Sequence, residues 1–140
     1  MRHREALPPA APLLIFVALL LALAAMGQAA PVVEPGYVSA LAAANHLLQA
    51  WQSGDVESGM VLLTRHAKKT ASPDVVEKFF SNPGPSAYEI GHGKLLKRGR
   101  YEFPVVLLTS ASKDVGKHRR LSSIVVVNTG NNDWAVDKLP

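Results

Sequence analysis

The chain has 140 residues, of which 48% are hydrophobic, and its formal net charge at pH 7 is +4. This length points to one domain, and the apolar content is too high for a disordered chain. Short basic clusters lie at residues 65–69, 97–100 and 117–120, but none carries interleaved aromatic residues. A nucleic-acid-binding surface is therefore not expected. The absence of cysteine excludes disulfides and lipid attachment through an N-terminal cysteine.

The first 29 residues follow the order of a secretory signal peptide. A basic start at residues 1–4 precedes thirteen apolar residues at 13–25, and the small residues Gly27 and Ala29 come next. We therefore predict cleavage after Ala29 and export from a bacterial cell, to the periplasm or the medium. The apolar run is shorter than the roughly 20 residues of a membrane-spanning helix. An uncleaved membrane anchor is the alternative.

Residues 30–36 hold two prolines and a glycine and are predicted to form a linker. From Tyr37, apolar residues recur at steps of four and three as far as Trp51, which predicts a helix that ends at Ser53 and Gly54. Asp55 is expected to cap a second helix. Pro73 is expected to open a third helix that ends at Ser81. The residues expected to face the core are Val56, Met60, Leu63 and Ala67 in the second helix, and Val75, Val76, Phe79 and Phe80 in the third.

After Pro85 the period of the apolar pattern changes from near 3.6 residues to 2, which predicts strands. Four antiparallel strands are expected at 87–96, 101–110, 119–128 and 133–139, joined as a meander. Gly91 and Gly93 predict a bulge or bend inside the first strand. The turn between the last two strands is predicted from Asn and Gly residues, which tolerate the positive φ of a tight reversal.

Two stretches resemble the NTF2-like (cystatin-like α+β) superfamily. Residues 47–55, Leu-Leu-Gln-Ala-Trp-Gln-Ser-Gly-Asp, are similar to its opening helix, Gly-Asp and second helix, and residues 133–139 are similar to its closing strand. The resemblance covers residues 37–139 and implies an α+β fold: three helices packed on a curved four-stranded antiparallel sheet, shaped as a cone with a pocket at its open end. A short strand between the second and third helices, found in many members, would have room only at residues 67–71. Members with this fold include isomerases, dehydratases, binding proteins and assembly modules, so the fold does not choose a function.

Both faces of the two central strands are apolar in the middle. We predict that Tyr101, Phe103, Val105 and Leu107 face the helices together with Leu121, Ser123, Val125 and Val127. A second apolar set is then left on the outer face: Val106, Leu108, Ile124 and Val126. An exposed patch of this kind marks an interface. Homodimerisation through this face is what the resemblance also implies, although the linker folding over the sheet would serve equally.

Tyr88, His92 and Trp134 are candidates to line the pocket at the open end of the cone. A histidine there would be suited to general base catalysis, because its pKa lies near neutrality. No carboxylate is placed opposite a tyrosine inside the pocket, as the isomerases of the superfamily would require, so no catalytic residue is assigned. The five histidines have no metal-binding spacing, and neither a metal nor a cofactor is expected.

These observations favour an exported module, without catalytic activity, that binds a small apolar ligand or assembles with protein. A small enzyme of the isomerase or dehydratase type, using the pocket, is one alternative. A membrane-tethered accessory domain is another, and it requires that the N-terminal segment stays uncleaved.

Overall fold

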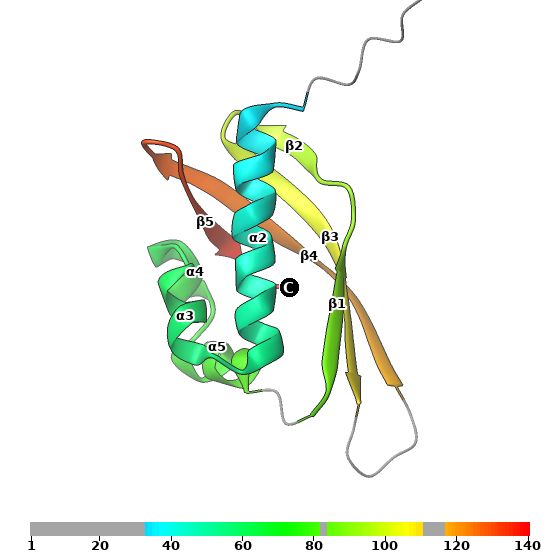
Figure 1. Ribbon diagram of the computed structural model, residues 1–140. Helices are drawn as coiled ribbons and strands as arrows, with labels where there is room; N and C mark the ends of the chain where they lie inside the picture. Colours follow the sequence, from blue (N-terminus) through cyan, green and yellow to red (C-terminus); the bar gives the residue numbers. More distant parts are fainter. Residues whose placement is uncertain (1–32, 82–83, 111–116) are drawn as a thin grey trace, which may run out of the picture. The chain divides into compact units, whose positions relative to one another are not determined.

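The computed structural model describes residues 33–81, 84–110 and 117–140, which lie in one compact unit (Figure 1). The predicted signal peptide, residues 30–32 of the linker and the turn at 113–116 lie outside the described residues. In the part of the chain that the structure describes, four helices are followed by five strands, and α2 lies across one face of the sheet (Figure 1). The predicted fold class, helices packed on an antiparallel sheet, is confirmed.

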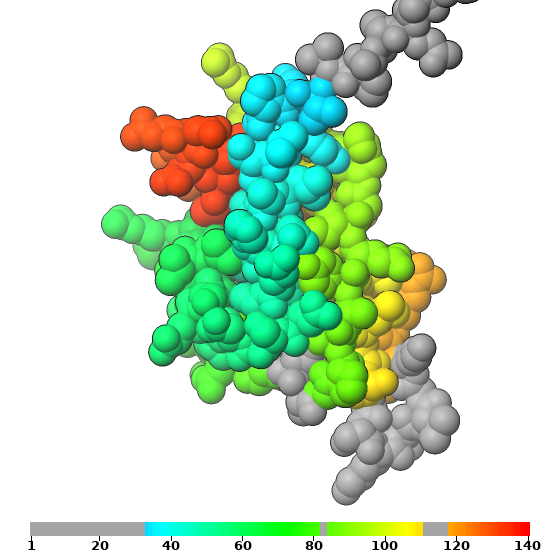
Figure 2. Space-filling model, viewed as in Figure 1, coloured from blue at the N-terminus to red at the C-terminus, as the bar shows by residue number. Residues whose placement is uncertain are grey.

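Helix α2 (Pro35–Ser53) begins two residues earlier than predicted, because Pro35 itself takes the first helical position. Its apolar face follows the expected period, and Ala44, Leu47 and Leu48 are completely buried. Gly54 ends the helix in the left-handed conformation, with φ of 69°. In the space-filling view, α2 runs along the length of the visible face (Figure 2).

The predicted second helix is two helices, so that prediction was wrong. Helix α3 (Val56–Val61) begins as expected at Asp55, whose carboxylate accepts a hydrogen bond from the Ser58 backbone N–H at 3.0 Å. Helix α4 (Arg65–Thr70) has its own cap at Thr64, whose hydroxyl accepts from the Ala67 N–H at 3.0 Å. Between them Leu63 forms a parallel bridge to Val136. The expected short strand thus lies at this bridge and not at residues 67–71.

Helix α5 (Pro73–Phe80) buries Phe80 completely and leaves Val76 only 1% exposed, as predicted. Val75 was expected in the core but is 53% exposed, because the helix turns it away from the sheet. Gly59 on α3 is buried against Phe80, and a Cβ atom at this position would overlap the Phe80 ring. These contacts fix α3 and α5 against each other beside the C-terminal end of α2.

The five strands form one antiparallel sheet in the order β1-β3-β4-β5, with β2 also paired to β3. The predicted first strand is divided into β1 (Ser86–Ile90) and β2 (Lys94–Lys97), with the break at the expected glycines. Strands β3 (Arg100–Ser110) and β4 (Lys117–Gly130) form the long central pair, and β5 (Asp133–Lys138) closes the sheet. Leu63 pairs with the outer edge of β5, so this edge is partly covered.

The register of β3 against β4 places Phe103 opposite Ile124 and Tyr101 opposite Val126. Directly opposed residues share a face of the sheet, and all four side chains are buried at 5% exposure or less beneath the helices. The faces predicted for β4 were therefore exchanged. Ile124 and Val126 belong to the core, whereas Leu121 and Val125 lie on the outer face with Val106 and Leu108.

Among the described residues, no helix is both long enough and apolar enough to cross a membrane.

Candidate functional site

Of the three predicted pocket residues, only Trp134 lines one of the two clefts described below. The Tyr88 hydroxyl donates to Asn45 Oδ1 of α2 at 2.7 Å, so it ties β1 to the helix. His92 is exposed in the β1–β2 connection, and its ring centroid lies 5.5 Å from that of Tyr37. Neither Tyr88 nor His92 lines either of the two clefts described below.

Trp134 lines a cleft of about 660 Å³ beside the start of α2, which we call the N-terminal cleft. The indole packs against Tyr101 with ring centroids 5.8 Å apart. The Tyr101 hydroxyl donates to Glu34 at 2.6 Å, and this carboxylate raises the pKa of Tyr101 above its ordinary value. Arg98 completes the polar part of this cleft.

The outer face of the sheet is polar towards β2 and β5. Glu102 lies 2.9 Å from the Lys94 ammonium and accepts a hydrogen bond from Ser123 at 3.0 Å. The hydrogen bond from Lys94, followed by that from Ser123, lowers the pKa of Glu102. Lys138 lies 3.4 Å from the Ser123 hydroxyl and extends the network to β5. Val106, Leu108 and Leu121 form an apolar part of the outer face, away from this polar network.

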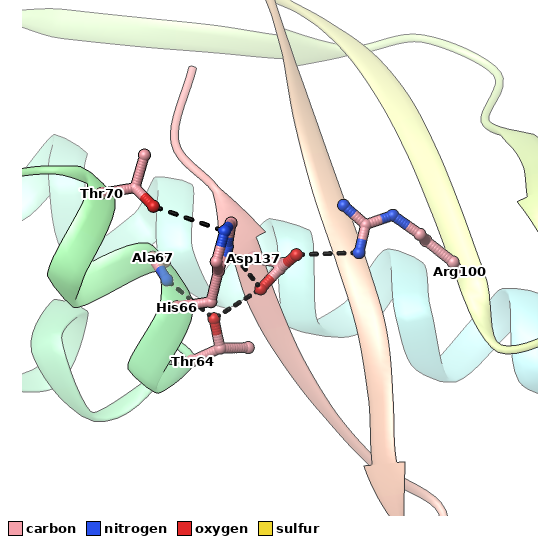
Figure 3. Close-up of polar contacts among 6 residues, drawn as sticks. All are labelled: Thr64, His66, Ala67, Thr70, Arg100 and Asp137. Atoms are coloured by element: carbon pink, nitrogen blue, oxygen red, sulfur yellow. Dashed lines mark hydrogen bonds and ion pairs between the residues drawn. The ribbon is translucent and has the colours of Figure 1, made fainter.

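Asp137 lies at the centre of a second polar cluster, on the edge where β5 meets α4 (Figure 3). Its carboxylate accepts a hydrogen bond from Thr64 at 2.7 Å and from the Arg100 guanidinium at 2.8 Å, and His66 Nδ1 lies 3.3 Å away. The Asp137 side chain is only 10% exposed. Burial acts to raise its pKa, but the bonds from Thr64 and Arg100 and the charge of Arg100 outweigh burial and hold the pKa of Asp137 below its usual value. His66 is exposed, and no residue of the cluster lines the N-terminal cleft or the cleft described next.

The strongest candidate for a ligand site is a cleft of about 570 Å³ between α5, the C-terminal end of α2 and the ends of β3 and β4. We call it the basic cleft. Its walls are mainly apolar. The apolar residues are Trp51, Val75, Phe79, Leu107 and Leu139. Trp51 and Phe79 stack with ring centroids 6.3 Å apart, so the aromatic wall is held rigidly.

Four basic residues border the same cleft: Lys78 on α5, and His118, Arg119 and Arg120 on β4. The register sets Arg120 opposite Leu107 and His118 opposite Thr109, so both belong to the face of the sheet that the helices cover. Arg119 pairs with Leu108 and therefore alternates to the outer face. The Arg120 guanidinium donates to the Pro140 carbonyl oxygen at 3.1 Å, which holds it over the end of the chain.

Both halves of this site are present in the sequence, as the basic cluster at residues 117–120 and as Phe79, which the helical period predicts in the core. The pairing of Arg120 with Leu107 and of His118 with Thr109 brings these two side chains onto the inner face, and no local pattern encodes it. Among the described residues, no group of three histidine, aspartate or glutamate side chains could hold a metal ion.

Comparison with known proteins supports the fold. No protein-family model matches the chain, and no curated protein matches it. A ketosteroid isomerase-like protein from Erwinia carotovora atroseptica SCRI1043 superposes with a TM-score of 0.59 at 14% identity, covering 76% of this chain and 94% of that one. An NTF-2 like protein of unknown function from Shewanella oneidensis MR-1 gives a TM-score of 0.54 at 11% identity, with coverage of 71% and 93%. The domain therefore has an NTF2-like fold, as the sequence resemblance implied, and at these identities the likeness concerns the fold alone.

Proposed function

We propose that this domain is a binding module for a small apolar ligand and that the basic cleft is its binding site. The proposal rests on the volume of the basic cleft and on the residues that line it. A cleft of about 570 Å³ falls within the roughly 300–1,000 Å³ of small-molecule sites. Such sites present mainly apolar and aromatic surface together with placed polar groups. The surface of this cleft is likewise mainly apolar, and polar or charged side chains make up about half of the residues that line it.

Binding without turnover is part of this proposal. The catalytic alternative relies on His92 and Tyr88, and these residues lie away from the basic cleft, beside Tyr37 and Asn45. His92→Ala should therefore leave ligand-induced thermal stabilisation unchanged. Loss of that stabilisation in the variant would instead favour a functional pocket around His92.

The test uses tryptophan fluorescence. The chain has two tryptophans, so Trp134→Phe leaves Trp51, in the wall of the basic cleft, as the single reporter. Titration of this variant with 1-decanol, a neutral apolar probe, should change the Trp51 emission saturably. Thr109→Phe should fill the cleft and weaken the binding at least about tenfold, since a well-packed site does not accept an added ring. Val61→Phe, on a side chain that is 80% exposed on α3, is the matched control.

Circular dichroism shows whether Thr109→Phe folds, and Ser81→Phe on the opposite wall replaces it if it does not. Absence of saturable binding in the single-tryptophan chain, or equal weakening by Val61→Phe and Thr109→Phe, would refute the proposal.

Export of the domain also belongs to the proposal. It is supported by the order of basic, apolar and small residues in the first 29 positions. N-terminal sequencing of the protein recovered outside the cytoplasm should find a chain that begins at Ala30. A chain that retains residues 1–29 in the membrane fraction would favour a tethered accessory domain instead.

The second proposed partner is another copy of the chain, packed on the apolar part of the outer face. Val106 lies between Glu89 on β1 and Leu121 on β4, and Leu121 is 71% exposed. Arg119 follows on the same face of β4, across the patch from Glu89. A two-fold axis parallel to β3 would bring Glu89 of each copy near Arg119 of the other, so the charges at the borders of the patch are complementary.

Analytical ultracentrifugation tests the dimer. Leu121→Ser should shift a dimer towards monomer, whereas Leu95→Ser, at a side chain that is 53% exposed on β2, should not. A monomeric wild-type chain at micromolar concentration would remove this part of the proposal.

A further inference from the structure

The basic cleft places positive charge directly beside its apolar walls. Lys78 approaches from α5, and His118 and Arg120 from β4. No acidic residue is found among the described residues that line the cleft, and the ion pairs described elsewhere in the domain involve none of these cations.

Arg120 and Lys78 retain most of their hydrogen-bonding capacity. A guanidinium has five N–H donors and an ammonium has three. The described contact of Arg120 is one hydrogen bond, to the Pro140 carbonyl oxygen. Cations at a rim that is partly shielded by apolar walls attract an anion more strongly than they would in open water.

The apolar side of the cleft lies next to these donors. Leu107 is directly opposite Arg120 in the sheet and is 3% exposed, so the guanidinium and the leucine belong to one wall. Lys78 and Phe79 are consecutive residues of α5, and both line the cleft. Each cation therefore has an apolar neighbour in the wall of the basic cleft. Arg120 has Leu107 on the sheet, and Lys78 has Phe79 on α5.

From this arrangement we infer that the ligand is an amphipathic anion. Its carboxylate or phosphate head contacts Lys78 and Arg120, and its apolar tail lies on Trp51, Phe79 and Leu107. This inference rests on the proposed function, because it names the class of ligand that the basic cleft binds. Carboxylate and phosphate share the chemistry that the cations recognise, and the experiment distinguishes between them.

The experiment titrates the Trp134→Phe full chain with decanoate, decyl phosphate and 1-decanol, which have the same tail, and follows Trp51 emission. At least one of the two anions should bind about tenfold more tightly than decanol, as expected for charge-assisted hydrogen bonds. The double variant Lys78→Gln/Arg120→Gln should remove this difference, so that the anions bind no more tightly than decanol.

The matched control is Lys97→Gln/Arg98→Gln, which removes the lysine at the end of β2 and the arginine that follows it in the turn to β3, both outside the basic cleft. It should bind all three probes as the parent does. Equal affinity for the anions and decanol, or equal weakening by both double variants, would overturn the inference while leaving the proposed function intact. Failure of all three probes to bind would overturn the proposed function as well.

Discussion

The ion pair between Asp137 and Arg100 should make a measurable contribution to the stability of the domain, and Asp137→Asn tests it. The substitution keeps the size of the side chain and its hydrogen bond from Thr64, but removes the charge that Arg100 contacts at 2.8 Å. A hydrogen bond to a charged group contributes about 1.5–3 kcal/mol, against about 1 kcal/mol for a neutral one. Removing one partner of a fully buried pair costs about 3–5 kcal/mol.

The value expected here is lower, because the Arg100 side chain is 30% exposed and water partly replaces the lost partner. We expect Asp137→Asn to lower the free energy of unfolding by about 2 kcal/mol at neutral pH. Urea denaturation, with the transitions followed by circular dichroism, measures this change. Arg100→Met and the double variant complete a mutant cycle, in which the coupling energy isolates the pair.

The pH dependence gives an independent check. The pKa of Asp137 in the folded state lies below its ordinary value of 3.8. Its contribution is therefore fully present above the unfolded pKa and is lost as the pH falls through the folded pKa. The stability difference between the parent and Asp137→Asn should shrink below about pH 4. A difference under about 0.5 kcal/mol at neutral pH, or one that is unchanged in acid, would refute the reasoning.

Three further substitutions test the packing of the helices and the hydrogen bond between Tyr101 and Glu34. Phe80→Ala, at a side chain with no exposed area, should cost about 3–5 kcal/mol in urea denaturation, because it opens a cavity among α2, α3 and α5. Gly59→Ala should cost about 1–3 kcal/mol in the same assay, since its Cβ overlaps the Phe80 ring, and an unchanged midpoint would contradict the close approach. Tyr101→Phe should remove, from a spectrophotometric alkaline titration, a phenol that ionises above the ordinary range of tyrosine, because the hydrogen bond to Glu34 raises the pKa of Tyr101. The contribution of this hydrogen bond to stability is present below about pH 10 and is lost as the pH rises through the folded pKa.

The sequence predicts the elements of this fold well where a local signal marks each boundary. Gly54 supplies the left-handed residue that ends α2, and Asp55 supplies the cap of α3. Gly91 and Gly93 mark the break between β1 and β2. The prediction fails at residues 62–64, where the helical period continues from Met60 to Ala67. Two signals compete with that period: Thr64 caps a new helix, and the backbone of Leu62 and Thr64 bonds to Val136. The second is a contact with a residue more than seventy positions away, which no local pattern shows.

The wrong prediction of which face of β4 is buried has a different cause. Residues 124–127 form an uninterrupted apolar run, Ile-Val-Val-Val, so alternation cannot decide which set faces the helices. A shift of one residue in register moves every side chain to the opposite face. Only the pairing of Phe103 with Ile124 fixes the choice. The interface candidates Val106 and Leu108 keep their outer position, and Leu121 takes the place that had been given to Ile124.

The same register explains why the ligand site could not be found from the sequence. On the inner face, β4 proceeds from Val126 and Ile124 in the core to Ser122, and then to Arg120 and His118. Here charged residues continue on the inner face past the last core residue, and α5 places Lys78 and Phe79 at the same cleft. This continuation of the inner face from apolar to basic residues distinguishes a cleft suited to an amphipathic ligand from a solvated strand end. It becomes visible only when the residue opposite each position is known.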